Sequence, residues 1–448
     1  MPKFRWQTGL GATSLGLLGM LLMGSSMPPL RPLALANLPI VPQWGSPWMA
    51  QISAPDPSAE AILRQSIAGL GAAGVSVTAQ GVAFLAGGGT IAQHQGSVPL
   101  PAASLTKLAT TLAALKTWEP TQQFETRVGI TGSVEGGILQ GDLVIRASQD
   151  PFFVWEEAIV LANTLQQIGI QRVNGKLIIL GNFAMNFNRD PVQAGEFLKQ
   201  GMNASLWPTE AHKQYGRLPT DTPVPQLQVV GDVQVLPASA EASVAPQWVI
   251  SHRSLPLVGL LKAMNIYSNN AMADMMAQAV GGPEVMMAIV SEETGISTTE
   301  IRLVNGSGLG EGNQISARGV VAMLIALQRS LQGTDYTIAD LMPVIDKDGG
   351  TLLNRNLPPG SAMKTGSLAT VSSLGGVFPT RDRGLVWFAI LNRGSNLDGL
   401  RARQDQLINA LEQHWGAAPN IPAHLQTQIS FSQPPYQLGD PNRNQVLE

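Results

Sequence analysis

The chain has 448 residues, which is more than one ordinary domain contains, so we expect about two or three domains. Hydrophobic residues make up 44% of it, which allows a sizeable core and excludes global disorder. The net charge of −3 offers no basic surplus to neutralise phosphates, so nucleic-acid binding is not expected. Cysteine is absent, which excludes disulfides, thiolate catalysis and iron–sulfur clusters.

The N-terminus has the three parts of an export signal in the usual order. Lys3 and Arg5 precede an uncharged apolar run at residues 9–23, and Ala34-Leu35-Ala36 is typical of a cleavage site. The apolar run is shorter than the roughly 18 residues that a membrane span needs. We therefore predict a signal peptide at 1–36 and a periplasmic location. An uncleaved anchor, with peripheral membrane association, is the alternative.

Residues 37–58 are rich in Pro and Ser and are predicted to be a linker. Apolar spacing then predicts a helix at 59–70 and a strand at 75–85. A Gly-rich turn separates this strand from a hairpin partner at 90–95. The next helix is predicted at 102–118, with Pro101 close to its start.

The predicted elements become shorter between residues 119 and 245, where we predict an inserted smaller α/β domain. The expected elements are short strands at 126–130, 141–146, 176–180 and 226–235. One clear helix is expected among them, at 156–168. Longer elements return over 246–416. They comprise helical patterns within 252–278 and at 318–331, strands at 361–364, 372–378 and 384–392, and a closing helix at 397–415. The tail at 417–448 is rich in Pro, Gln and Asn and is expected to be loosely ordered.

Ser104 and Lys107 form an S-x-x-K pattern at the start of the helix predicted at 102–118. The i, i+3 spacing places both side chains on one face, and the helix N-terminus supplies N–H groups to an oxyanion. A neutral lysine could take the serine proton. The alternative is a plain helix-turn serine with a solvated lysine, since Ser361 and Lys364 share the pattern in an extended segment.

The second candidate motif is Lys364-Thr365-Gly366-Ser367, at a predicted strand. Lys and Thr can bind a substrate carboxylate, and Gly366 allows another backbone to approach closely. The alternative is an exposed strand end without a function.

The third candidate motif is Ser268-Asn269-Asn270, which begins a Met-rich helix. The functional interpretation has Ser268 relaying a proton and Asn270 hydrogen-bonding a substrate amide. The alternative makes Ser268 a helix N-cap and the methionines core residues.

These three motifs occur in the order S-x-x-K, S-x-N and K-T-G, which is the signature set of penicillin-interacting serine enzymes. Within that group the sequence resembles the low-molecular-mass class C penicillin-binding proteins, the D-Ala-D-Ala carboxypeptidase/endopeptidase family. Four further stretches carry the resemblance: LPAASLTKLATTLAAL around Ser104, GDLVIRASQDP, Asn305-Gly-Ser-Gly-Leu309 and Gly349-Gly-Thr-Leu352. The sequence departs from the family pattern at three places. Asn305 stands where the family usually has an acid, and Ala147-Ser-Gln149 replaces the glycines before Asp150-Pro151. The span between Ser104 and Ser268 is also shorter than in the family.

The resemblance implies a penicillin-binding/β-lactamase-like fold, in which an antiparallel sheet flanked by helices is built from 59–118 and 246–416. It also implies an exported serine DD-peptidase that cleaves D-Ala-D-Ala ends or D-Ala crosslinks in peptidoglycan peptide stems. β-Lactams are its expected covalent inhibitors, and no metal or cofactor is required.

The resemblance also implies roles for single residues. Ser104 is the nucleophile and Lys107 its base, while Ser268 and Lys364 return the proton to the leaving amine. The N–H groups of Ser104 and Ser367 form the oxyanion hole. The side chains of Lys364 and Thr365 bind the terminal carboxylate, and Asn270 contacts the acyl side of the substrate.

One alternative motif register and three alternative functions stay open at this stage. Tyr267-Ser268-Asn269 also matches the Y-x-N motif of class C β-lactamases and related esterases, although the insert favours S-x-N at Ser268. A β-lactamase or esterase-like hydrolase would deacylate fast. A catalytically silent peptidoglycan-binding relative would leave Ser104 inert, and a structural envelope protein would neither bind nor react.

Overall fold

A computed structural model describes residues 56–447 of the chain. The predicted signal peptide and most of the predicted linker lie outside the described residues. Within 56–447, no helix combines the length and the apolar character that a membrane crossing requires.

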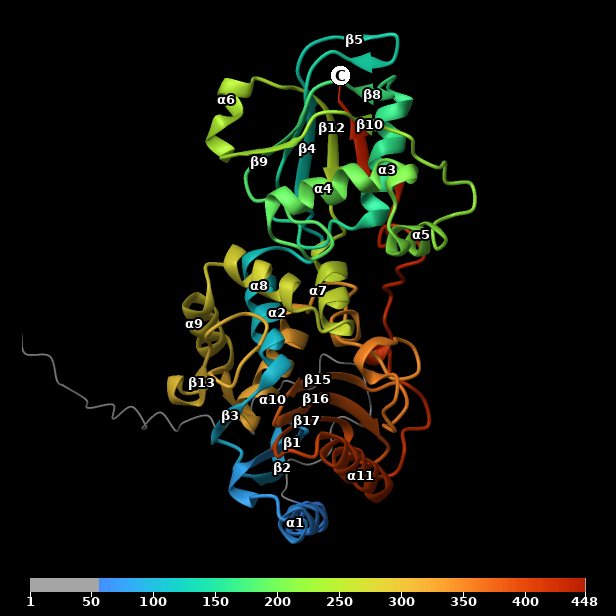
Figure 1. Cartoon of the computed structure of the whole chain (residues 1–448). Coiled ribbons are helices and arrows are strands. Elements are labelled where there is room, and N and C mark those ends of the chain that lie inside the picture. The colour runs from blue at the N-terminus through green and yellow to red at the C-terminus, as the bar shows by residue number, and fades with distance from the viewer. Residues whose placement is uncertain (1–55, 448) are drawn as a thin grey trace, which may run out of the picture. The chain divides into compact units, whose positions relative to one another are not determined.

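The central sheet of the first domain has five antiparallel strands in the order β15-β16-β17-β1-β2 (Figure 1). Their bounds are β1 Gln80–Ala86, β2 Gly89–His94, β15 Ala362–Leu368, β16 Val371–Thr380 and β17 Gly384–Arg393. Strand β17 is buried on both faces, so its sequence is a continuous apolar run instead of an alternating one. The sheet therefore has a layer of helices on each face.

A different pair of helices covers each face of the sheet. Side chains such as Leu385 and Leu391 pack toward the cluster of α2 (Thr106–Thr117) and α10 (Ala317–Ser330). The alternating side chains, such as Phe388, pack toward α1 (Pro57–Ala72) and α11 (Leu397–Trp415). Residues of α2 from Thr106 to Ala114 are all buried, because this helix lies inside the helical layer. It is the helix that follows the S-x-x-K serine.

The helical layer is completed by α7 (Leu257–Ile266), α8 (Asn270–Ala279) and α9 (Pro283–Thr294). Every residue of α7 is buried. A small sheet in the order β13-β14-β3 lies beside this layer, with the bounds β3 Pro99–Pro101, β13 Ile301–Arg302 and β14 Gln314–Ser316. These elements carry the S-x-N motif and the Asn305–Leu309 loop.

The region predicted as an insert contains two further sheets. The larger has six strands in the order β11-β9-β7-β4-β12-β18, and the smaller has the order β10-β8-β6-β5. The strand bounds are β4 Glu125–Ile130, β5 Val134–Glu135, β6 Ile138–Leu139, β7 Leu143–Arg146, β8 Arg172–Val173, β9 Leu177–Leu180, β10 Gln228–Val229, β11 Val233–Leu236, β12 Gln247–Arg253 and β18 Asn444–Val446. The helices are α3 Trp155–Gln167, α4 Pro191–Gly201, α5 Thr209–Tyr215 and α6 Glu241–Val244.

Two features differ from the sequence expectations. Strand β12 pairs with β4 in the insert's sheet, although the first domain was expected to resume at residue 246. The tail was expected to be loosely ordered, yet β18 pairs with β12 and the buried Arg443 forms an ion pair with the buried Glu157. Both features depend on contacts between distant parts of the chain, which local patterns do not report.

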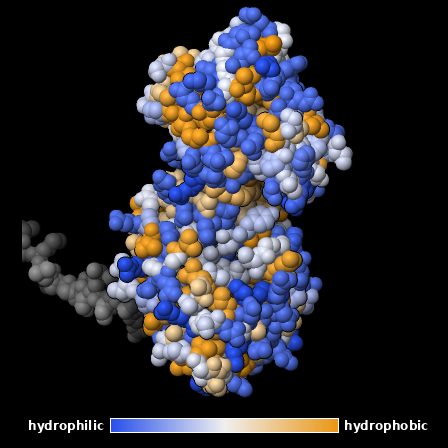
Figure 2. All heavy atoms as spheres, viewed as in Figure 1, coloured by the Kyte–Doolittle hydropathy of each residue, from blue (hydrophilic) through white to orange (hydrophobic). Residues whose placement is uncertain are grey.

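On the face drawn in Figure 2, hydrophobic residues form small separate groups among hydrophilic ones.

Candidate active site

The S-x-x-K pair lies where the short helix η4 (Ala103–Leu105) leads into α2. Lys107 Nζ donates a hydrogen bond to Ser104 Oγ at 3.0 Å, so the two side chains meet as the spacing predicted. The same ammonium nitrogen donates to Asn270 Oδ1 at 2.8 Å and to the Ser307 carbonyl at 2.7 Å. Lys107 is fully buried, and this burial lowers its pKa to about 7, although Asp274 opposes the shift.

The Asn305–Leu309 loop forms one wall beside this lysine. Asp274 on α8 accepts hydrogen bonds from Ser307 N at 2.9 Å and from Gly306 N at 3.2 Å. Gly308 has a φ of +80°, and a Cβ there would lie 1.9 Å from the Ala103 carbonyl oxygen. A glycine is therefore required for this loop to pack against the nucleophile turn.

Asn305, which replaces the family's usual acid, stabilises this loop from within. Its Oδ1 accepts from Gly308 N at 2.8 Å, and its Nδ2 donates to the Leu309 carbonyl at 2.8 Å. An amide provides both the acceptor and the donor, whereas an ionised acid provides acceptors alone.

The S-x-N and K-T-G motifs meet at a second buried lysine. Lys364 Nζ on β15 donates to Ser268 Oγ at 2.9 Å and to the Thr365 carbonyl at 2.8 Å. Burial holds the pKa of Lys364 well below its usual range, and the nearby charge of Lys107 adds to this effect. Two amines therefore lie close together in a site that disfavours their protonation.

Ser268 is not the N-cap that the sequence suggested as an alternative. Asn269 caps α8 by accepting a hydrogen bond from Met272 N at 3.0 Å. Ser268 has a φ of +51°, in the left-handed region that is rare for residues other than glycine. This conformation accompanies the contact of its hydroxyl with Lys364, and such backbone outliers cluster at functional sites. Tyr267, the residue of the alternative motif, is 58% exposed and does not line the cleft around Ser104.

Strand β15 approaches the nucleophile turn at Gly366. A Cβ at this position would lie 2.8 Å from Ser104 N and 2.2 Å from Ser373 Oγ. Ser373 on β16 donates to the Ala102 carbonyl at 2.8 Å, which joins the sheet to the turn. Only glycine fits between these groups, as the K-T-G motif suggested.

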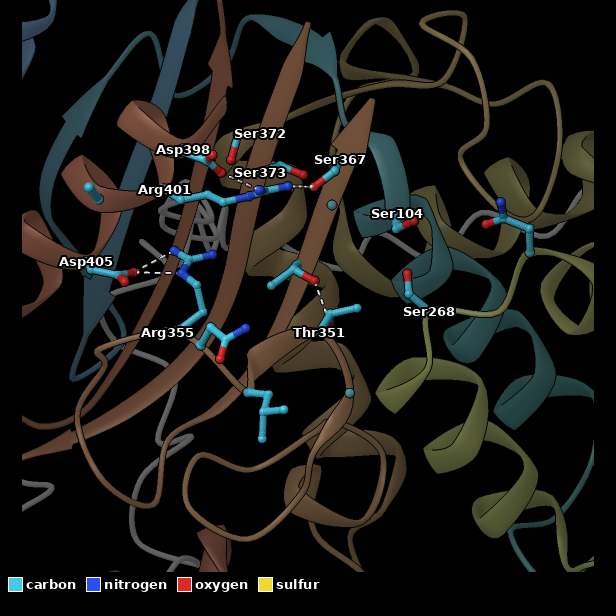
Figure 3. A pocket seen from close by; sticks show the side chains of 17 residues that line it. Ser104, Ser268, Thr351, Arg355, Ser367, Ser372, Ser373, Asp398, Arg401 and Asp405 are labelled. Atoms are coloured by element: carbon cyan, nitrogen blue, oxygen red, sulfur yellow. Dashed lines mark hydrogen bonds and ion pairs between the residues drawn. The ribbon is translucent and has the colours of Figure 1, made fainter. Parts of the chain in front are cut away.

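The motifs surround a cleft of about 770 Å³, drawn in Figure 3. Eight lining residues come from the motifs and from β16: Ser104, Ser268, Asn270, Thr365, Gly366, Ser367, Ser372 and Ser373. Sequence reasoning did not assign a role to the other lining residues, among which are the polar side chains of Thr351, Arg355, Asp398, Arg401 and Asp405.

These five residues form a polar end of the cleft. Thr365 Oγ1 donates to Thr351 Oγ1 at 2.7 Å. Arg401 on α11 donates through Nη2 to Ser367 Oγ at 3.1 Å. The Gly349–Leu352 resemblance could have indicated Thr351. No spacing or motif marked Arg401, because it is one of several charged residues on an amphipathic helix.

The arrangement has the parts that acyl transfer needs. A serine hydroxyl lies within hydrogen-bond distance of an amine whose pKa of about 7 leaves much of it neutral at neutral pH. The serine also lies in the first turn of a helical segment, where backbone N–H groups are available to an oxyanion.

Comparisons with known proteins point in the same direction. The model of the D-Ala-D-Ala carboxypeptidase 3 (S13) family matches residues 62–185 and 227–414. The carboxypeptidase DacB of Mycolicibacterium smegmatis is 23% identical over 415 residues, which cover 84% of this chain and 88% of the relative. The D-alanyl-D-alanine carboxypeptidase DacB of Haemophilus influenzae is 25% identical over 390 residues, covering 66% of this chain and 80% of the relative.

Solved structures confirm the expected fold. A predatory endopeptidase from Bdellovibrio bacteriovorus, acylated by penicillin G, superposes with a TM-score of 0.65 at 23% identity, covering 75% of this chain and 92% of that one. Penicillin-binding protein 4 from Haemophilus influenzae gives a TM-score of 0.57 at 19% identity, covering 79% of this chain and 100% of that one. The penicillin-binding/β-lactamase-like fold that the family resemblance implied is therefore confirmed.

Proposed function

Because the chain belongs to the D-Ala-D-Ala carboxypeptidase 3 (S13) family, a family of serine peptidases, we propose that it cleaves D-Ala-D-Ala ends or D-Ala crosslinks of peptidoglycan stems through an acyl-enzyme on Ser104. One observation carries the proposal. Ser104 Oγ lies 3.0 Å from the nitrogen of Lys107, whose pKa is lowered to about 7. A nucleophile beside a base of matched pKa is the first requirement of this chemistry.

In the acylation step, Ser104 Oγ attacks the carbonyl carbon of the penultimate D-Ala while the neutral Lys107 takes the hydroxyl proton. The N–H groups of Ser104 and Ser367 bind the oxyanion that develops, because Gly366 permits the strand to lie against the nucleophile turn. The C–N bond of the terminal D-Ala then breaks.

The leaving amine needs a proton at this point. Ser268 Oγ accepts a hydrogen bond from Lys364 Nζ, so its own hydroxyl hydrogen can be donated toward the cleft. Ser268 passes its proton to the amine and regains one from the protonated Lys364, and the proton that Lys107 took from Ser104 replaces the one lost by Lys364, so that Lys107 is neutral again. A water molecule then hydrolyses the acyl-enzyme, with Lys107 again acting as the base.

Substrate binding uses the remaining motif residues. Thr365 and Lys364 bind the terminal carboxylate from β15. Asn270 Oδ1 is occupied by Lys107, so its Nδ2 is the group that can donate to an acyl-side carbonyl. β-Lactams present a similar amide and carboxylate, and we expect them to acylate Ser104.

An enzyme that acts on peptidoglycan must be exported, which agrees with the signal peptide predicted at 1–36. A periplasmic location follows from that signal. Peripheral membrane association stays a prediction, because the N-terminal segment lies outside the described residues.

The test is release of D-alanine from a synthetic stem peptide that ends in D-Ala-D-Ala. We expect Ser104→Ala to reduce the rate at least about 10⁴-fold, as removal of a nucleophile does. Ser361→Ala is the matched control, because Ser361 also begins an S-x-x-K sequence but donates its hydroxyl to the Pro358 carbonyl. Equal rates for wild type and Ser104→Ala would refute the proposal.

A second pair of variants tests the S-x-N register. Ser268→Ala should slow acylation strongly, whereas Tyr267→Phe should leave it within about threefold, because Tyr267 lies outside the cleft. The opposite pattern would assign the motif to Tyr267.

A further inference from the structure

We propose that Arg401, on helix α11, adds a cationic contact to the terminal carboxylate that Thr365 and Lys364 bind, and thereby selects substrates that end in a free carboxylate. The inference rests on the proposed peptidase function and adds a specificity-determining residue to it. It starts from the polar end of the cleft, where a helix of the opposite face of the sheet reaches the K-T-G strand (Figure 3).

The guanidinium of Arg401 contacts Ser367, the last residue of the K-T-G-S segment. Arg401 Nη2 donates to Ser367 Oγ at 3.1 Å, and Arg401 Nη1 donates to Asp398 Oδ1 at 2.9 Å. Ser367 follows Gly366 on β15 and lines the same cleft as Ser104. A hydroxyl that accepts from a guanidinium can direct its own hydrogen to a further acceptor. A carboxylate beside Ser367 would therefore meet both an O–H donor and a cation.

The other cations near this point are already engaged. Lys364 is fully buried, and its nitrogen donates to Ser268 Oγ and to the Thr365 carbonyl. Burial also lowers the pKa of Lys364, which reduces its charge. Arg355 donates through two nitrogens to Asp405, and its side chain is only 7% exposed.

Arg401 differs from both of these residues. A guanidinium remains protonated over the whole working pH range of an enzyme. Its planar donors match the two oxygens of a carboxylate. Its side chain is 37% exposed, so it is within reach of a ligand in the cleft. Among the described residues that line the cleft, it is the cation whose donor faces the K-T-G strand.

A purely structural role for Arg401 does not account for this placement. Its ion-pair partner Asp398 has a side chain that is 92% exposed, and such surface pairs contribute little to stability. The contact of Nη2 with Ser367 Oγ brings the guanidinium to the wall of the cleft, which both residues line.

The experiment compares two synthetic peptides that differ only in their C-terminus, a free D-Ala-D-Ala acid and its carboxamide. The quantity measured is the ratio of their kcat/KM values. We expect Arg401→Gln to lower the acid-to-amide ratio about 30-fold, which is within the range for one hydrogen bond to a charged group. Arg401→Lys, which keeps the charge but not the planar donors, should lose less of the ratio.

Arg403→Gln is the matched control, because Arg403 lies on the same helix but packs against Gly69 of α1. It should leave the ratio unchanged. Thermal unfolding of each variant checks that it is folded, and the ratio is independent of the fraction of active enzyme. An unchanged ratio in Arg401→Gln would overturn the inference while leaving the peptidase function intact. A wild-type enzyme that cleaves neither peptide would instead refute the proposed function.

Discussion

The pH dependence of acylation tests the role of Lys107 as base. Burial lowers its pKa to about 7, and the base must be neutral to accept the Ser104 proton. The neutral fraction is about one tenth at pH 6 and about nine tenths at pH 8, so the acylation rate should rise about tenfold between them. The rate should then level off above pH 8, until other groups titrate.

Replacement of Asp274 changes this profile in a known direction. The Asp274 carboxylate favours the protonated form of Lys107, so Asp274→Asn should move the midpoint to lower pH. Asparagine keeps a carbonyl acceptor for the N–H groups of Gly306 and Ser307, which Asp274 now binds. The variant therefore removes the charge while it can retain the loop geometry.

The assay is stopped-flow acylation by a chromogenic or fluorescent β-lactam from pH 5.5 to 9, on wild type and Asp274→Asn. Thermal unfolding at each pH separates acylation from loss of fold. A rate that is independent of pH over this range would refute Lys107 as the titrating base. A midpoint that rises in Asp274→Asn would contradict the electrostatic argument.

Three further predictions follow from packing. Gly366→Ala should slow acylation at least about a hundredfold, because its Cβ would lie 2.8 Å from Ser104 N; β-lactam acylation measures this, and a rate near wild type would contradict it. Arg443→Ala should lower the free energy of unfolding by about 3–5 kcal/mol, because it leaves the buried Glu157 unpaired; denaturant unfolding should show the loss, and a change below about 1 kcal/mol would refute it. Asn305→Asp should cost about 1 kcal/mol, since only the donor to the Leu309 carbonyl is lost; a stabilised variant would show that the amide donor is unimportant.

Local patterns predicted those parts of the site in which one short segment determines the geometry. Ser104 and Lys107 belong to one helical turn, so their spacing was sufficient to bring the side chains together. The closing helix at 397–415 was predicted with the bounds of α11, because its apolar residues recur at helical spacing.

The sequence was less informative where one residue has two competing uses. Ser268 matched a helix N-cap, but the cap is Asn269 and the Ser268 hydroxyl contacts Lys364 instead. The left-handed backbone at Ser268 that separates these two outcomes has no signal in the surrounding residues.

Contacts between distant segments could not be predicted at all. Arg401 reaches Ser367 from another element, and β18 pairs with β12 across nearly two hundred residues of chain. Helices α4 and α9 were also missed. In α9 only Met286 and Val290 are buried, so this helix carries little periodic signal. A single sequence contains no information on such pairings beyond composition and spacing.

The central claim is that Ser104 forms a covalent acyl-enzyme. The most direct measurement is intact-mass spectrometry of the purified protein during incubation with penicillin, followed over hours, with Ser104→Ala as the control. We predict one adduct of the mass of penicillin on the wild type, located at Ser104 by peptide mapping, and none on the variant. An adduct that persists in Ser104→Ala, or no adduct on folded wild-type protein, would contradict the account.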